Sequence, residues 1–377
     1  MINERRLIAL TQRLVRINSE NPPGDERAVA LCVADALRAA GLRPRRFALH
    51  PGRDNVAAVL KGRSSRGSLL ITPHLDTVPA GRGWRVKPFS GLVRGGKLYG
   101  RGATDCKGNL AVGVEAMVSL AEDGVRLAHD VIFLATADEE TGSHKGLVPV
   151  LKKNIVRPSF ALILDSDEFN IIAAQKGLLH FSVRVPGRKA HGAYPQRGIN
   201  AIDRALRLIR ALEALRWPRQ RHRLLKPPTV NIGTIRGGDK VNMVADWCVF
   251  EADLRFLPGR TPAAALRRVR AALKATGVPH KLTVDDAQKP YEIDARHPLV
   301  ASLREASRAC GAPAPVTGSE GATVITFFQD KAIPAVATGY GARGTAHTTD
   351  EFVRVKDLVL GARVLERFVR TFDAKRG

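Results

Sequence analysis

Three apolar segments of this sequence run directly into acidic or histidine residues. The segments and the polar residues that follow them are 68–72 with His74 and Asp76, 131–137 with Asp138, Glu139 and Glu140, and 160–164 with Asp165. Helical patterns lie nearby, over 26–40 and 109–122. Strands that alternate with helices form mostly parallel sheets, and ligands bind at the carboxyl ends of such strands. The sequence therefore predicts an α/β fold with a polar site at those strand ends.

The spacing of His74 and Asp76 adds a first detail to this site. Side chains on a strand alternate with a period of two, so the two residues point to the same side and Asp76 can hold one imidazole nitrogen. The other nitrogen is then free to bind a metal. The pair alone is weak support, because a single histidine is more often a hydrogen-bonded structural residue. Asp105, just before the helix predicted over 109–122, would by itself be interpreted as a helix N-cap.

The complete set of polar residues favours a metal site. Three consecutive acids at 138–140 repel one another unless a cation lies nearby. The candidate ligands all fall at strand ends or in adjoining loops, and they are His74, Asp105, Glu140, Asp165 and His347. Imidazole and carboxylate ligands suit Zn²⁺, with Co²⁺ or Mn²⁺ as substitutes. Three carboxylates and one bridging hydroxide balance two divalent ions, which lie about 3.5–4 Å apart in such sites. Glu139 is left over and could move a proton from water to a leaving amine.

The rhythm of the sequence changes after Gly177. The expected elements are then strand 178–185, helix 200–216, strand 229–236, strand 247–255, helix 261–276 and strand 281–285. This βαββαβ order is that of a small ferredoxin-like α+β domain. The sequence therefore predicts a catalytic domain over 1–176 and 286–377, with an inserted domain over 177–285.

Length and composition limit the class of protein. A chain of 377 residues with 44% hydrophobic and 25% charged residues is an ordinary globular mixture, long enough for two domains. No run of about 18 apolar residues predicts a membrane span. The arginines in the first helical pattern, 4–17, argue against a signal peptide. The four cysteines lie far apart, as in reduced thiols of the cytosol. We therefore expect a cytoplasmic protein.

The formal net charge of +24 raises the question of nucleic-acid binding. The basic residues are scattered through the predicted helices, and only 5% of the residues are aromatic, so a stacking platform for single strands is not apparent. The pattern favours an arginine-rich solvated surface and argues against a nucleic-acid partner.

Two glycine-rich segments match nucleotide-binding loops only in part. Residues 91–98 nearly have the spacing of a phosphate-binding loop, but Leu98 stands where the magnesium-binding hydroxyl belongs. A hairpin turn at 95–96 is the better interpretation. Residues 339–344 match Gly-x-Gly-x-x-Gly, yet no helix is expected directly after them, so we attribute this match to chance.

Together, these motifs resemble those of the di-zinc amidohydrolase and peptidase family that includes acetylornithine deacetylase, succinyl-diaminopimelate desuccinylase, aminoacylase and glutamate carboxypeptidase. The resemblance covers nearly the whole chain, including the inserted domain. It implies a zinc-peptidase-like catalytic domain with two Zn²⁺ ions. It also implies roles for the quoted residues: Asp76 orients His74, Glu139 is the general base, Asp105 bridges the metals, and the remaining metal ligands are Glu140, Asp165 and His347.

The resemblance extends to residues outside this cluster. His191 in the inserted domain is similar to a histidine that helps to bind the developing oxyanion from a partner subunit, which implies a homodimer formed through 177–285. Asn242 and Arg255 are similar to the family's substrate-binding pair. Looser similarities add three further substrate-binding candidates, which are Lys176, Thr323 and Arg343.

Three positions depart from the family pattern. Pro73 stands where glycine usually precedes the metal-binding histidine, Cys106 follows the bridging aspartate, and Val324 replaces an acid in the last substrate loop. These departures leave the expected chemistry intact and the substrate open.

The expected reaction is hydrolysis of an amide by hydroxide that two zinc ions activate. The expected substrate is an N-acyl amino acid or small peptide whose carboxylate pairs with Arg255, because guanidinium and carboxylate groups pair in bidentate fashion. A deacylase of amino-acid biosynthesis is favoured, and a dipeptidase or carboxypeptidase is the alternative. A non-catalytic binding protein is disfavoured, since it would have no use for Glu139.

Overall fold

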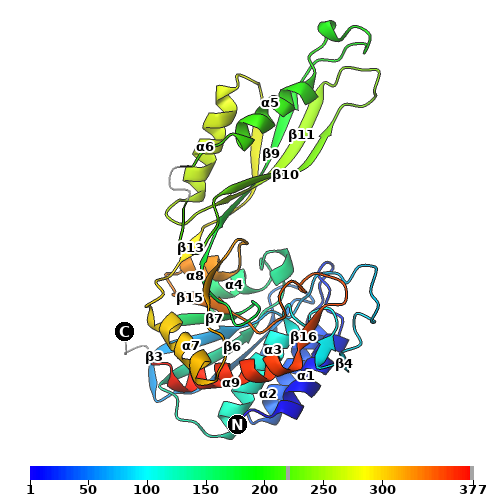
Figure 1. Cartoon of the computed structure of the whole chain (residues 1–377). Helices are drawn as coiled ribbons and strands as arrows, with labels where there is room; N and C mark the ends of the chain where they lie inside the picture. Colours follow the sequence, from blue (N-terminus) through cyan, green and yellow to red (C-terminus); the bar gives the residue numbers. More distant parts are fainter. Residues whose placement is uncertain (218–220, 374–377) are drawn as a thin grey trace. The chain divides into compact units, whose positions relative to one another are not determined.

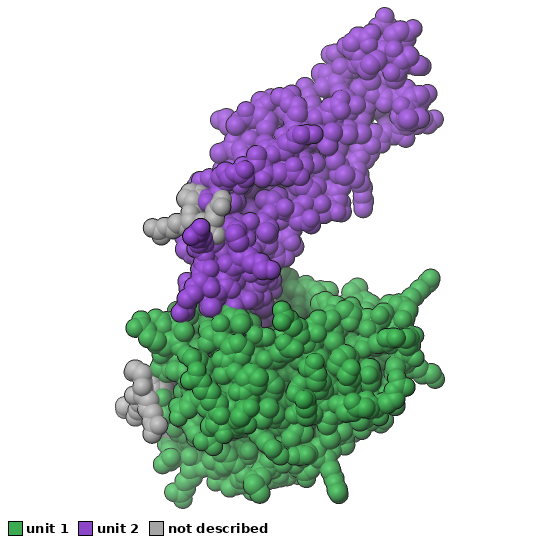
Figure 2. All heavy atoms as spheres, in the orientation of Figure 1, with its two compact units in different colours: residues 1–173, 293–317, 327–377 green, residues 174–292, 318–326 purple. Residues whose placement is uncertain are grey.

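The computed structural model describes residues 1–217 and 221–373, and the chain divides into two compact units (Figures 1 and 2). Unit 1 consists of Met1–Ala173, Ile293–Thr317 and Phe327–Gly377, and unit 2 of Ala174–Glu292 and Gly318–Thr326. Unit 2 covers the proposed insertion 177–285 and extends a few residues beyond both of its ends.

The segment 318–326 groups with unit 2, whereas the sequence analysis placed it with the catalytic domain. Its contacts explain the difference. The Lys176 N–H donates to the Ser319 carbonyl (3.2 Å). Gly318 lies so close to Leu225 that a Cβ would come within 2.5 Å of that side chain. These contacts join residues far apart in the sequence, so no local pattern predicts them.

Unit 1 contains most of the helices and strands that the sequence pattern predicts. Its helices are α1 Glu4–Arg16, α2 Arg27–Ala39, α3 Lys107–Glu122, α4 Leu147–Lys152, α7 Pro298–Ala309 and α9 Val355–Thr371. Its strands are β1 Arg45–Ala48, β2 Asp54–Leu60, β3 Ser64–Thr72, β4 Leu92–Arg94, β5 Lys97–Tyr99, β6 His129–Ala135, β7 Phe160–Leu164, β15 Ala335–Thr338 and β16 Phe352–Arg354. Three elements span a boundary between the units along the chain, and they are β8 Ile171–Gln175, β14 Val316–Ser319 and α8 Ile325–Gln329.

The large sheet has the strand order β1-β2-β6-β3-β7-β15-β8-β13, where β13 is Tyr291–Glu292, and β14 also pairs with β8. Neighbouring strands from β6 through β3 and β7 to β15 are parallel. The outer pairs are antiparallel. The predicted α/β class with a mixed sheet is therefore confirmed, with the parallel pairing concentrated in the four central strands. The carboxyl ends of β6, β3 and β7 consequently meet, which brings their following loops together.

Helix α3 is the central helix of unit 1. Its residues from Lys107 to Leu120 are all buried, and most of them are apolar or glycine. It contacts β6 and β7 as well as α1 and α9. Gly113 permits the close approach to the sheet, because a Cβ there would lie 2.9 Å from the ring of Phe133. This packing fixes the start of α3, and with it Asp105, beside the strand ends.

A small three-stranded sheet has the order β16-β5-β4. The turn at Gly95 and Gly96 joins β4 to β5, which pair in antiparallel fashion, so the predicted hairpin is confirmed. Strand β16 pairs with the other side of β5 and leads directly into α9. The sheet thus connects β5, which precedes the loop before α3, to β16, which leads into α9.

Unit 2 contains strand β9 Gly177–Pro186, helix α5 Ala201–Glu213, strands β10 Thr229–Gly237 and β11 Trp247–Phe256, helix α6 Pro262–Ala275 and strand β12 Lys281–Gln288, with a short 3₁₀ helix at Pro195–Arg197. The antiparallel sheet has the order β10-β11-β9-β12. Helices α5 and α6 cover one face, as Figure 1 shows. Buried residues alternate along β11, which is the pattern of a strand with one covered face. Unit 2 has its own hydrophobic core.

No helix in the described ranges 1–217 and 221–373 is long and apolar enough to cross a membrane.

Candidate metal centre

The predicted ligands of unit 1 come together at the carboxyl ends of three adjacent strands. His74 follows β3 and forms a parallel bridge with Thr136, just after β6. A short 3₁₀ helix, Glu139–Thr141, follows in the same loop. Asp165 comes directly after β7. The local reason is the pattern noted in the sequence: each apolar strand ends where polar residues begin.

Asp105 lies between the two histidines of the cluster. One carboxylate oxygen is 2.9 Å from His74 Nε2, and the other is 3.0 Å from His347 Nε2. The N-cap position of α3 belongs to Cys106 instead, and the Asp105 carboxylate is directed at the imidazoles. A carboxylate with one oxygen toward each histidine has the arrangement of a bridging metal ligand.

Two candidate groups of ligands are joined by the contact between Asp105 and His74. Asp105, Glu140 and His347 offer ligand atoms that all lie within 4.8 Å of one another, and so do His74, Glu139 and Asp165. Glu140 Oε2 lies 3.3 Å from His347 Nε2, and Asp165 Oδ1 lies 4.0 Å from His74 Nε2. The structure thus gathers all five predicted ligands and Glu139 in one cluster.

Asp76 lies next to this cluster and orients two parts of it. It is fully buried, and its carboxylate accepts hydrogen bonds from the backbone N–H groups of Glu139 (3.0 Å) and Glu140 (3.1 Å). Its backbone carbonyl lies 3.0 Å from His74 Nδ1, and a carboxylate oxygen lies 3.6 Å from the same nitrogen. Asp76 therefore orients both the imidazole of His74 and the acidic loop, and it leaves Nε2 of His74 directed at Asp105.

The pKa values of the cluster are shifted in the way expected for a site that binds cations. Burial, together with the carboxylate of Asp165, raises the pKa of Glu139 well above its ordinary value. Burial and the Asp105 carboxylate raise the pKa of Asp165 to about 7. Hydrogen bonds to Asp105 and then Glu140 raise the pKa of His347 to about 10. In the metal-free protein, protons supply the positive charge that these crowded carboxylates require, and a divalent cation would replace them. The donor set therefore fits the metals that the sequence predicts.

Cys106 lies beside the cluster in a different role. The His74 N–H donates to its sulfur (3.2 Å), and the thiol donates to the His74 carbonyl (3.3 Å). Burial raises the pKa of the Cys106 thiol to about 12. Its two hydrogen bonds join the end of β3 to the start of α3, and its sulfur also lies within 4.8 Å of ligand atoms of His74 and Asp105.

The remaining predicted residues are not part of this cluster. Arg343 belongs to unit 1 and is exposed. The others belong to unit 2, and they are Lys176, His191, Asn242, Arg255 and Thr323. His191 is exposed, and its loop is joined to that of Asn242 through the Gly192 N–H, which donates to the Asn242 carbonyl (2.8 Å). The two family-like motifs of unit 2 therefore lie side by side.

Three of these side chains form hydrogen bonds or ion pairs with other residues of unit 2. Arg255 forms a bidentate pair with Asp253 (2.8 and 3.0 Å). The ammonium group of buried Lys176 lies 2.6 Å from a carboxylate oxygen of Glu320. The hydroxyl of Thr323 donates to the side chain of Gln175 (2.7 Å). These contacts position the side chains within unit 2.

Two residues that support the cluster were not predicted from the sequence. Asn21 donates from its side chain to Asp76 (2.8 Å). Buried Glu351 accepts the backbone N–H groups of Thr104 (2.9 Å) and Asp105 (3.0 Å). An acid four residues after His347 and an asparagine beside two prolines are visible in the sequence, but only the folded chain shows which groups they contact.

The comparisons with known proteins agree with this geometry. The sequence matches the peptidase family M20/M25/M40 over residues 70–371, and the chain belongs to this family. It is 34% identical over 320 residues to an acetylornithine deacetylase of Proteus mirabilis, with 80% of this chain and 78% of that protein covered. It is 32% identical over 337 residues to an acetylornithine deacetylase of Photorhabdus laumondii, with 85% and 83% covered.

Solved structures share the fold. An aminopeptidase PepT from Bacillus cereus has a TM-score of 0.82 at 22% identity, with 98% of both chains covered. An M20 family metallo-carboxypeptidase from Sulfolobus solfataricus also has a TM-score of 0.82, at 18% identity, with 99% of both chains covered. A Bacillus subtilis protein described as a dinuclear metal-binding peptidase has a TM-score of 0.76 at 16% identity, with 97% of both chains covered. The resemblance deduced from the motifs is confirmed, and the protein is a metallohydrolase.

Proposed function

We propose that the protein is a di-zinc deacylase that releases an amino acid from an N-acyl amino acid. The arrangement of Asp105 between two ligand sets, each with one histidine, supports this proposal most directly. Acetylornithine deacetylases among the curated relatives support an N-acyl amino acid as the substrate class. A dipeptidase or carboxypeptidase is the second candidate, because the family to which the chain belongs is named for peptidases.

In this proposal His74, Asp105, Glu140, Asp165 and His347 hold two Zn²⁺ ions, with Co²⁺ or Mn²⁺ as substitutes. The bound ions would polarise the amide carbonyl and lower the pKa of a water molecule. Glu139 takes the proton from that water and returns it to the departing amine. In the metal-free protein, burial and the carboxylate of Asp165 raise the pKa of Glu139, so this side chain is able to hold a proton. Asp76 keeps the imidazole of His74 in the required orientation.

The substrate carboxylate is proposed to pair with Arg255, which Asp253 already holds in a fixed orientation. His191 would bind the polarised carbonyl oxygen, and Asn242 would bind the substrate together with Arg255; the loops of His191 and Asn242 adjoin within unit 2. Thr323, Lys176 and Arg343 are proposed as further contacts to the substrate. We also propose a homodimer formed through 177–285, with His191 acting at the partner's metal centre. All four cysteines are free thiols, which supports the proposed location in the cytoplasm.

The decisive experiment combines metal analysis with a substrate screen. Zinc- or cobalt-loaded protein is expected to hold two ions per chain, to lose activity with a chelator and to regain it with the metal. N-acetyl, N-succinyl and N-formyl amino acids are compared with dipeptides by release of free amine. Absence of bound metal after zinc loading would contradict the site. Faster release from dipeptides than from every N-acyl amino acid would favour the peptidase.

A matched variant makes the metal analysis specific. Glu140→Gln removes one predicted ligand and is expected to lower the metal content. Glu122→Gln makes the same change at an acid that pairs with Arg6 on the far end of α3, and it should leave the metal content unchanged.

A further inference from the structure

Three basic residues form a row across the small sheet of unit 1. Arg94 of β4 is the cross-strand partner of Lys97 of β5, and Lys97 is also the partner of Arg354 of β16. Residues directly opposite one another in antiparallel strands project from the same face of the sheet. Like charges in such positions repel each other and destabilise the sheet. A row of three cations is therefore a feature that an anion would stabilise.

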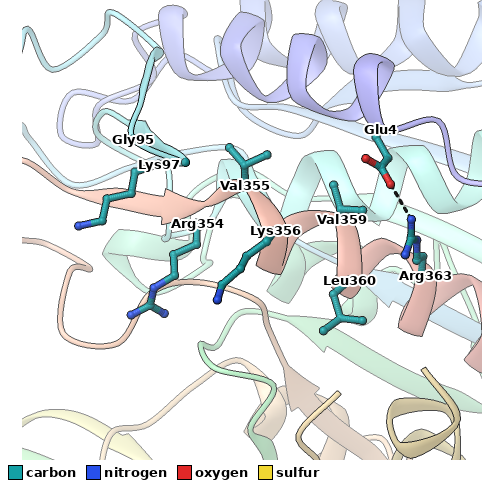
Figure 3. A pocket seen from close by; sticks show the side chains of 10 residues that line it. Glu4, Gly95, Lys97, Arg354, Val355, Lys356, Val359, Leu360 and Arg363 are labelled. Atoms are coloured by element: carbon teal, nitrogen blue, oxygen red, sulfur yellow. Dashed lines mark hydrogen bonds and ion pairs between the residues drawn. The ribbon is translucent and has the colours of Figure 1, made fainter. Parts of the chain in front are cut away.

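Two residues of the row, Lys97 and Arg354, line a cavity of about 630 Å³ beside the start of α9 (Figure 3). Lys97, Arg354 and Lys356 line it, and Figure 3 shows their side chains extending toward the same side. A second part of the wall is apolar, formed by Val355 and Val359 together with Leu360. The cavity thus presents cations next to an apolar surface.

The acids near this cavity balance only part of its charge. Glu4 pairs with Arg363 (2.5 Å), as Figure 3 shows, and Asp357 lies 3.3 Å from Arg354. The ammonium group of Lys97 lies 4.0 Å from the centre of the Phe352 ring. Lys356 is exposed and has no hydrogen-bond or ion-pair partner among the residues that the structure describes.

The walls of the cavity are preformed. The Val355 N–H donates to the Gly96 carbonyl (2.9 Å), which fixes the start of α9 against the β4–β5 turn. Lys97 and Arg354 are held by the strand pairing of β5 with β16. A ligand would therefore order only side-chain ends, which keeps the entropic cost of binding low.

We propose that this cavity binds a small organic phosphate, with the phosphate on Lys97, Arg354 and Lys356 and an apolar body against Val359 and Leu360. Its volume lies within the range of about 300–1,000 Å³ that is typical of small-molecule sites. A phosphate dianion would neutralise the excess positive charge. The apolar wall favours a phosphate ester over inorganic phosphate, because only the ester has an apolar group to place against it. The site is outside the metal cluster and goes beyond the proposed hydrolase function.

Calorimetric titration of the zinc-loaded protein with AMP tests this proposal. Separate titrations with adenosine and with inorganic phosphate, the two halves of AMP, serve as comparisons. AMP is expected to bind at least tenfold more tightly than either half. Raising the ionic strength should weaken AMP binding, because the contacts are electrostatic. Phenyl phosphate should also bind, because it shares with AMP the features that the proposal requires, a phosphate ester and an apolar group.

Variants assign the binding to the cavity. Lys97→Gln, Arg354→Gln and Lys356→Gln should each weaken AMP binding about fivefold, and the triple variant should abolish it. Arg43→Gln removes an exposed cation elsewhere in unit 1 and should leave AMP binding unchanged. AMP binding that survives in the triple variant would belong to the metal centre and would overturn the proposal. Equal affinity for adenosine and AMP, or no binding of AMP by the folded wild-type protein, would overturn it as well.

Discussion

Asp105 illustrates how one residue acquires a role from its neighbours. Its position before α3 is that of an ordinary capping residue, but the cap is Cys106 and the Asp105 carboxylate faces two histidines. These two imidazoles hold the pKa of Asp105 well below its usual range, although burial opposes this effect. Asp105 therefore remains ionised within a buried cluster and is ready to bind cations.

Replacing Glu139 tests the general base. We expect Glu139→Gln to keep nearly normal metal content and to lose on the order of 10²–10⁴ in rate, because a proton-transfer group is removed while the side-chain shape stays. Steady-state rates and metal analysis of the same sample provide the measurement. Loss of metal in this variant would mean that Glu139 is a ligand, in keeping with its place near His74 and Asp165.

Metal binding should depend on pH in a predictable direction. The pKa of His347 is raised to about 10, so the metal-free protein at pH 8 carries a proton on this imidazole. A metal binds only the neutral ring and must displace that proton. Zinc affinity should therefore rise with pH, about tenfold per unit for one displaced proton. The pKa of His74 is also raised, so this imidazole should release a proton as well. Below pH 7, Asp165, with a pKa of about 7, should add a further proton.

Calorimetry of zinc binding at pH 8 in buffers of different ionisation enthalpy would count the released protons. Zinc binding without proton release at this pH would refute the protonated state of His347. Removal of the imidazole in His347→Ala should lower the number of protons released at pH 8 without abolishing the release, because the pKa of His74 is also raised and this second ligand must lose its proton as well.

Arg255 provides a test of substrate recognition. Arg255→Ala should slow hydrolysis of substrates that carry a free carboxylate and should have little effect on amidated analogues, because only the former pair with a guanidinium group. The ratio of kcat/KM for the two substrates is the measurement. Equal losses would show that Arg255 acts only through its pair with Asp253.

At the scale of elements, buried Arg101 and Glu351 join three loops of the metal centre. Arg101 Nη1 lies 2.6 Å from Glu351, and its other terminal nitrogen donates to the Pro79 carbonyl (3.3 Å). Glu351 also accepts the backbone N–H of Asp105 from 246 residues away. The pair thus connects the loop after β3, the loop before α3 and the loop before β16.

Breaking this ion pair should destabilise unit 1. Glu351→Gln leaves the Arg101 charge buried without its partner, which typically costs about 3–5 kcal/mol. Denaturant unfolding of the metal-free protein should show this loss of unfolding free energy. Arg85→Gln is the control, because it removes an exposed partner of neighbouring Asp350 and should have a much smaller effect. Similar losses in both variants would contradict the proposed role of burial.

At the scale of the whole molecule, the proposed dimer shares its active sites. Inactive Glu139→Ala and His191→Ala proteins would be dissociated, mixed in equal amounts and reassembled. If His191 serves the partner's centre, each mixed dimer regains one complete site, and random pairing should restore roughly a quarter of normal activity. A mixture no more active than either parent would refute the shared site. Glu139→Ala mixed with Glu140→Ala is the control and should remain inactive, since both residues belong to the same cluster.

Much of the fold could be predicted because its signals are local. The apolar period marks strands such as β6 and β7, and the helical pattern over 109–122 corresponds to α3. The acids that end each strand showed where the site would form, because parallel neighbours present their carboxyl ends together. The order of elements in unit 2 follows from the same periodicities.

The sequence by itself determined the strand and helix pattern, the family and the residue types of the metal centre, since each depends on neighbours along the chain. Only the tertiary structure decided which groups meet. The bond from Glu351 to Asp105, the pairing of Lys97 with Arg354 and the placement of 318–326 with unit 2 join distant segments. Such contacts depend on strand register and on packing between elements, and neither is encoded in the period of a single segment.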